Sequence, residues 1–336
     1  MKISHILLLT LLLGACGVPV AEQPVITLTP DVGALSTQAV ATVYSSLTLT
    51  PVEPVDTATA IPTLPPLQSS FIDKFDVAMV LVPAGSFLMG RDLTAGGQPY
   101  IEATIGGFYV DMVEVTNLRY MVCVHAGACA APDHQSSYTH ASYYLNPAFA
   151  NYPVLISSVF PKKADDYCAW RGMHLLTDIE WEKAMRGTDG RSYPWGNTPP
   201  DGTRANLCDI NCFQSQANKS INDGYTDVAP VGSFPAGASP YGVMDMVGNV
   251  NEMVAVSPQT YQAGPHYKSI GAAYDTPTDK TLDAMYNFDD SNPLNTGFRC
   301  ASDPVGEAVT PIFRQLRLTE TPIPAAAQSF LSAKRW

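Results

Sequence analysis

The hydrophobic and polar positions of this chain predict short elements separated by turns. Residues 79–90 consist of apolar runs interrupted by Pro83 and Gly85, a pattern typical of two short strands around a turn. Residues 108–117 predict a strand that leads into a helix capped by Thr116.

Two further helices are predicted in the middle of the chain. An extended segment leads into a short helix at residues 164–170. At the start of the next helix, Thr177 and Glu180 have the spacing of a capping box, and Gly187 provides the stop signal. This second helix is expected to direct Trp181 inward.

The first residues combine a positive start with an apolar run too short to span a bilayer, followed by small residues. Residues 1–15 are therefore predicted to be a signal peptide. Residues 13–16 resemble a bacterial lipobox, in which Cys16 becomes the acylated first residue of the mature protein. Acyl chains on Cys16 would anchor the protein to a membrane without a spanning helix. The alternative is an ordinary signal peptide with an incidental cysteine.

The remaining sequence divides by composition into three parts. Residues 16–70 are rich in Thr and Pro, so after the lipidated Cys16 they are predicted to form a disordered tether that holds the domain roughly 40 Å from the membrane. Residues 71–303 are long enough for one large domain, and residues 304–336 form a C-terminal tail to which the sequence assigns no role. The domain is thus expected outside the cytoplasm, at the cell surface or in the periplasm.

The charge balance narrows the class of partner. The chain has 19 Lys and Arg residues against 31 Asp and Glu residues, a formal net charge of -12. This balance argues against binding to nucleic acid and against adhesion to anionic lipid through a basic patch.

Six cysteines remain after Cys16, and an even number in an exported chain indicates disulfides. They allow fifteen pairings. The short spacings favour local bonds between Cys123 and Cys129 and between Cys208 and Cys212, which leaves Cys168 for Cys300. A zinc site at Cys208 and Cys212 is the competing interpretation. Such a site needs a second ligand pair, and the only histidine after residue 174 is at 266.

Several motifs along the chain, taken in order, resemble the formylglycine-generating enzyme family, also called sulfatase-modifying factors. They occur at residues 114–120, 174–184, 193–197, 205–207, 241–252 and 297–300. The resemblance implies an α+β fold, an irregular variant of C-type lectin architecture with little regular secondary structure. It also implies the bond from Cys168, in Tyr-Cys-Ala-Trp, to Cys300, in Gly-Phe-Arg-Cys.

The resemblance implies two calcium sites. The first consists of the side chains of Asp245 and Glu252 with the carbonyls of Gly248 and Val250. The second consists of the side chains of Asn206 and Asp223 with the carbonyls of Leu207 and Tyr225. Calcium prefers six to eight oxygen ligands, many of them carbonyls held by loops, so both sets are chemically suitable. The alternative is that these acids and amides only cap turns.

The catalytic part of the family pattern is missing. Members of the family carry a copper-binding cysteine pair before Gly-Phe-Arg-Cys, whereas this chain has no cysteine between Cys212 and Cys300. Copper(I) requires soft thiolate ligands, so copper is not expected as a cofactor. An iron site of Asp133, His134 and His140 is a further alternative, in a region expected to form loops.

The sequence therefore favours a surface-anchored lipoprotein whose domain lacks the oxidase activity and serves as a calcium-stabilised binding module for a protein or carbohydrate ligand. Tyrosines in predicted loops can supply flat contacts to such a ligand: Tyr138, Tyr143, Tyr144, Tyr261, Tyr267 and Tyr274. The alternative is a sulfatase-modifying-factor-type oxidoreductase that acts on a protein substrate through a relocated site. The sequence leaves the question of enzyme activity open.

Overall fold

Three small sheets form the framework of the computed structural model, which describes residues 67–90, 101–157, 161–257, 267–285, 294–304 and 312–315. The signal peptide, the lipidated Cys16 and almost all of the tether are predicted in residues outside this part of the chain. Among the described residues, no helix has the length and apolar character needed to cross a membrane.

The largest sheet has the strand order β1-β2-β5-β10-β6. Its strands are β1 (Ser70–Ile72), β2 (Ala78–Val82), β5 (Phe108–Asp111), β10 (Cys300–Ser302) and β6 (His174–Leu175), and neighbouring strands are antiparallel. All four residues of β5 are buried, and Val110 pairs with Val80 on one side and with Ala301 on the other. This sheet therefore brings the two ends of the domain together.

The two other sheets have three strands each. In one, β4 (Ile101–Ile105) lies between β3 (Gly85–Met89) and β11 (Ile312–Gln315), with antiparallel pairing on both sides. Part of the tail thus adds a strand to this sheet. In the other, β7 (Asn251–Ala255) pairs antiparallel with β8 (Tyr267–Ile270) and parallel with β9 (Thr296–Phe298).

The helices begin where the capping signals predict. Thr116 accepts a hydrogen bond from the backbone N–H of Arg119 at the start of α2 (Asn117–His125), and Thr177 forms the predicted capping box with Glu180 at the start of α4 (Asp178–Arg186). The helix predicted at 164–170 lies within α3 (Lys162–Arg171). The other helical elements among the described residues are α5 (Thr281–Ala284), η2 (Pro147–Phe149), η3 (Pro235–Gly237) and η4 (Thr278–Lys280).

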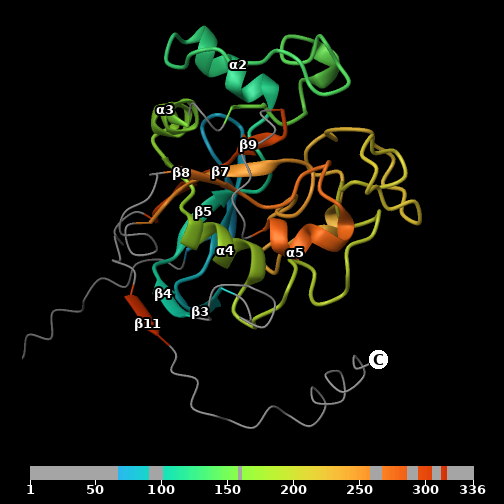
Figure 1. The fold of residues 1–336 in the computed structure, drawn as a ribbon. Helices are drawn as coiled ribbons and strands as arrows, with labels where there is room; N and C mark the ends of the chain where they lie inside the picture. The colour runs from blue at the N-terminus through green and yellow to red at the C-terminus, as the bar shows by residue number, and fades with distance from the viewer. Residues whose placement is uncertain are drawn as a thin grey trace, which may run out of the picture. The chain divides into compact units, whose positions relative to one another are not determined.

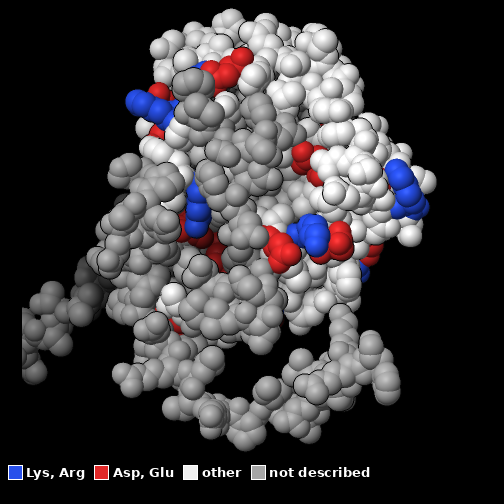
Figure 2. Space-filling model, viewed as in Figure 1, with Lys and Arg blue, Asp and Glu red and all other residues white. Residues whose placement is uncertain are grey.

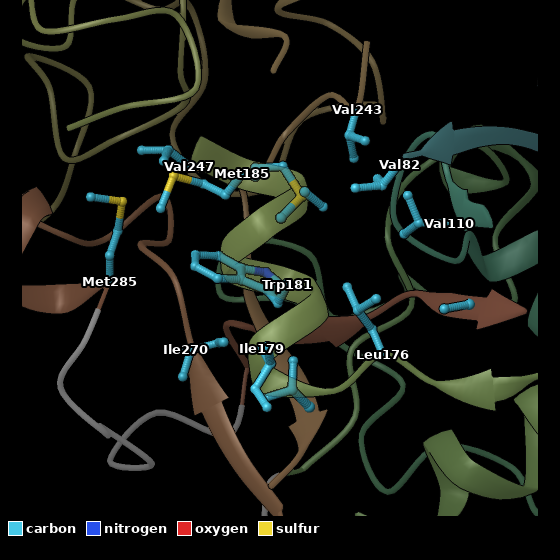
Figure 3. Close-up of a cluster of buried hydrophobic side chains, with 14 of the residues drawn as sticks. Val82, Val110, Leu176, Ile179, Trp181, Met185, Val243, Val247, Ile270 and Met285 are labelled. Carbon is cyan, nitrogen blue, oxygen red and sulfur yellow. The ribbon is translucent and has the colours of Figure 1, made fainter. Parts of the chain in front are cut away.

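Helix α4 carries the centre of the hydrophobic core. Figure 1 shows it between the sheet of β3 and β4 and the sheet of β7 and β8. Trp181 on α4 is almost fully buried, and Figure 3 shows it among Leu176, Met185 and Ile270. Burial of these apolar side chains is the main force that holds the sheets to the helix.

Loops make up most of the rest of the domain. Between α4 and β7, residues 188–250 contain isolated bridges and η3 but no strand. The expectation of little regular secondary structure is confirmed. All three predicted disulfides are present, namely Cys123–Cys129, Cys168–Cys300 and Cys208–Cys212. The last of these excludes a zinc site at Cys208 and Cys212, because a disulfide has no thiolate to bind the metal.

Candidate functional site

A buried ion pair occupies the first predicted calcium set. Glu252 on β7 accepts hydrogen bonds from Arg299, whose Nε lies 2.8 Å from Oε2 and whose Nη2 lies 2.5 Å from Oε1. The indole N–H of Trp181 donates to the same carboxylate at 2.9 Å. Arg299 also donates to the carbonyls of Asp111 and Met244. A cation at Glu252 would therefore compete with a fully buried guanidinium.

Two more buried carboxyl groups lie near this pair. Glu114 interacts electrostatically with Asp245, Glu252 and Arg299, and burial raises its pKa well above the usual value. Its Oε1 accepts a hydrogen bond from Asn249 at 2.9 Å, whereas Oε2 is buried without a partner. Burial also raises the pKa of Asp245, which accepts a hydrogen bond from the N–H of Gly232. Glu114 belongs to the family motif at residues 114–120, but no local pattern indicates that it lies beside Asp245 and Glu252.

The turn between Asp245 and Glu252 packs directly against the second calcium set. Gly248 has a φ of +90°, and a Cβ at this position would lie 2.6 Å from the carbonyl oxygen of Asn206. Only glycine fits this contact. The N–H of Asn249 donates to the same carbonyl at 2.9 Å. The structure therefore places the two predicted sets side by side.

The second set retains an oxygen that is free to bind a cation. Oδ1 of Asn206 is buried without a hydrogen-bond partner, while its Nδ2 donates to the carbonyl of Asp227 at 2.9 Å. The Asp223 carboxylate accepts from the N–H groups of Leu207 and Tyr225, both at 2.9 Å. Burial raises the pKa of Asp223 to about 7. These residues fit calcium better than the first set does.

The iron alternative is not supported by the arrangement of its residues. Asp133 forms an ion pair with Lys163 at 2.5 Å, whereas Nδ1 of His140 lies near the hydroxyls of Ser137 and Thr139. Within the described ranges, no group of three or more His, Cys, Asp or Glu side chains is placed to hold a metal ion.

A polar cavity of about 280 Å³ lies between β7, β8 and α5. Asn295 donates to the carboxylate of Asp275 in its wall at 3.0 Å. Most of its lining residues belong to the segment between the motif that ends at residue 252 and the motif that begins at residue 297, and this segment has no cysteine. Among the described residues, the cavity lining is rich in amide, hydroxyl and charged groups and contains no aromatic ring: Gln214, Asn251, Ser269, Gly271, Asp275, Thr276, Pro277, Lys280, Asp283, Ala284 and Asn295.

Three of the six tyrosines proposed as ligand contacts are not on the surface. Tyr143, Tyr144 and Tyr274 are buried, because their rings are used in the core. Tyr267 donates a short hydrogen bond to Asp165. Tyr261 lies outside the described residues. Tyr138 is the one member of the set that is clearly exposed within the described part of the chain.

Comparison with known proteins identifies the domain. Residues 72–304 match the sulfatase-modifying factor enzyme 1-like domain. The chain is 33% identical to the mouse inactive C-alpha-formylglycine-generating enzyme 2 over 276 residues, which cover 68% of this chain and 86% of the relative. It is 28% identical to the mouse formylglycine-generating enzyme over 296 residues, covering 67% and 75% of the two chains.

Solved structures agree on the fold. PvdO from Pseudomonas aeruginosa superposes with a TM-score of 0.52 at 23% identity and covers 70% of this chain and 98% of its own. Treponema denticola variable protein 1 superposes with a TM-score of 0.50 at 15% identity, covering 71% and 100%. The matched domain, the sequence relatives and the shared fold together show that this chain belongs to the formylglycine-generating enzyme, or sulfatase-modifying factor, family.

Proposed function

We propose that this protein is a surface-anchored lipoprotein whose family domain has lost the oxidase activity and acts as a calcium-stabilised binding module. One observation carries the proposal: all six cysteines after Cys16 are joined in disulfides. A disulfide sulfur is neither a thiolate nucleophile nor a ligand for copper. The three disulfides also indicate an oxidising compartment outside the cytoplasm.

The polar cavity is the place where such a module would bind its ligand. Most of its lining belongs to the segment between the two motifs, which has no cysteine, and includes Ser269, Asp275 and Asn295. Hydroxyl, carboxylate and amide groups can orient a polar ligand through hydrogen bonds but cannot hold a copper ion that activates oxygen. The similarity to a mouse relative named as inactive supports the same conclusion.

A thiol titration separates this proposal from an oxidoreductase with a relocated thiol site. The full chain with Cys16→Ser is denatured without reductant and titrated with a thiol reagent. We expect no free thiol before reduction and six after it, because each remaining cysteine has a partner. One or more free thiols in the unreduced chain would contradict the proposal and favour the oxidoreductase.

Calcium is expected to raise the melting temperature, and a chelator to lower it, because a ligand that binds the native state stabilises it by mass action. The Asp223→Asn substitution removes a charge from the second set and should shrink the calcium-dependent increase, measured by thermal unfolding with and without calcium.

Asp201→Asn is a matched control for this experiment. Asp201 accepts a hydrogen bond from the N–H of Thr203 at 2.9 Å, the same kind of turn that Asp223 makes with Tyr225, but it lies on the exposed surface outside both calcium sets. It should leave the calcium-dependent increase unchanged. A wild-type chain whose melting temperature does not respond to calcium would reject the calcium part of the proposal.

A further inference from the structure

Two aromatic rings stack on each other at the surface instead of entering the core. The ring centroids of Tyr138 and Phe213 are 3.6 Å apart, and the ring planes differ by 12°. The two residues remain 48% and 42% exposed. We call this pair the aromatic platform. A stack that leaves this much apolar surface in water contributes little to the core, so its position calls for another explanation.

Buried groups hold Tyr138 in place. Its two neighbours, Ser137 and Thr139, both donate to the carboxylate of Asp227, which is almost fully buried. The distances to Oδ2 are 2.7 Å from Ser137 Oγ, 2.9 Å from Thr139 N and 2.8 Å from Thr139 Oγ1. Three hydrogen bonds to one buried carboxylate fix the backbone on both sides of the exposed ring.

A disulfide constrains the backbone beside the other ring. Phe213 directly follows Cys212, which is bonded to Cys208 at a sequence separation of only 4. The backbone beside each ring is therefore constrained before any ligand arrives, which lowers the conformational entropy that binding costs.

One segment of chain links the aromatic platform to the polar cavity. Gln214 directly follows Phe213 and lines the cavity. Further along the chain, Gln216 and Asn218 line a shallow hollow of about 410 Å³ that shares Pro277 and Lys280 with the cavity. The cavity and the hollow thus adjoin each other, and residues 213–218 connect them to the aromatic platform.

The chemistry of this surface favours a ligand with many hydroxyl groups. Amide side chains both donate and accept hydrogen bonds, as hydroxyl groups do. The carboxylates of Asp275 and Asp283 can accept hydrogen bonds from hydroxyl groups, and the ammonium group of Lys280 can donate to them. In Figure 2 the surface over the loops drawn green at the top and yellow at the right of Figure 1 carries few charged side chains, whereas charged side chains of both signs lie together over α5. The net charge of -12 also disfavours acidic ligands. A proline-rich peptide could stack on the rings, but its prolines have no N–H to donate to the amide oxygens.

We infer that the aromatic platform and the polar cavity bind a neutral oligosaccharide, with the C–H face of one sugar ring on the platform and the hydroxyl groups of the adjoining sugar in the cavity. This inference rests on the proposed function, because it names the ligand class of the same cavity. It assigns Tyr138 and Phe213 to stacking and Gln214 to hydrogen bonding.

The test uses the full chain and measures binding by calorimetry to cellohexaose, mannohexaose and chitohexaose, with decaproline and hexagalacturonate as comparison ligands. We expect at least one neutral hexasaccharide to bind. Tyr138→Ala and Phe213→Ala should each weaken binding roughly tenfold, as is common for aromatic residues at the centre of a contact. Ile72→Ala removes an exposed apolar side chain on β1 and should have no effect.

The outcomes distinguish the ligand class from the proposed function. The inference is overturned if no neutral hexasaccharide binds, or if binding survives both aromatic substitutions while the variants keep the wild-type melting temperature. If decaproline binds instead, with the same dependence on Tyr138 and Gln214, the binding module stands and the ligand class is wrong. If a ligand binds and Gln214→Ala leaves its affinity unchanged, the cavity itself is not the binding site.

Discussion

Replacing Cys168 and Cys300 together by alanine is expected to lower the free energy of unfolding by about 5 kcal/mol, because the bond closes a very long loop in the unfolded chain. The two cysteines are 132 residues apart in sequence and join α3 to β10. Without the bond, the unfolded chain gains the entropy that the loop closure removes. Urea denaturation of the variant and of the wild-type chain, both without reductant, measures the difference.

The Cys208→Ala/Cys212→Ala variant provides the matched control. Both of its cysteines are buried, as Cys168 and Cys300 are, but they are only 4 residues apart. The same relation gives a loss of about 2 kcal/mol for this short loop. Equal losses in the two variants would show that local packing, and not loop closure, accounts for the stabilising effect.

Arg299→Met is expected to lower the free energy of unfolding by about 3–5 kcal/mol, because it leaves the Glu252 carboxylate buried without its counter-ion. Arg299 is fully buried and lies within hydrogen-bond distance of both oxygens of Glu252. The carbonyls of Asp111 and Met244 would also lose their donor. Urea denaturation at neutral pH measures the effect.

Arg204→Met tests whether burial causes this loss. Arg204 forms an ion pair with Asp201, and both side chains are substantially exposed. Exposed ion pairs contribute about 0–1 kcal/mol, so this variant should stay close to the wild type. If Arg299→Met behaved like Arg204→Met, the buried pair would not be important for stability.

These expectations explain why the Gly-Phe-Arg-Cys motif is present in a chain without the cysteine pair. A Cβ on Gly297 would lie 2.9 Å from Cγ2 of Val250, so the position has no room for a larger residue. Phe298 is fully buried and contacts the rings of Tyr120 and Tyr167. With the ion pair of Arg299 and the disulfide of Cys300, every residue of the motif serves the fold. The motif is therefore evidence of the family and not of its reaction.

The sequence alone was sufficient wherever an interaction spans a few residues or depends only on residue type. The caps at Thr116 and Thr177 were predicted because the capping side chain and its backbone partner are three residues apart. The absence of cysteine between Cys212 and Cys300 can be seen in the sequence itself, without knowledge of the fold. The family was recognisable because its motifs are short and occur in order.

Other features depended on contacts between distant parts of the chain. Glu252 and Arg299 are 47 residues apart, and no local pattern indicates that they form an ion pair. Glu114 lies 135 residues before Asn249, which donates a hydrogen bond to its carboxylate. The exposed ring of Tyr138 and the buried ring of Tyr143 belong to the same loop region, and only packing against the rest of the domain separates them. Burial and long-range pairing are decided when the whole chain folds, because each depends on which distant surfaces come together to exclude water.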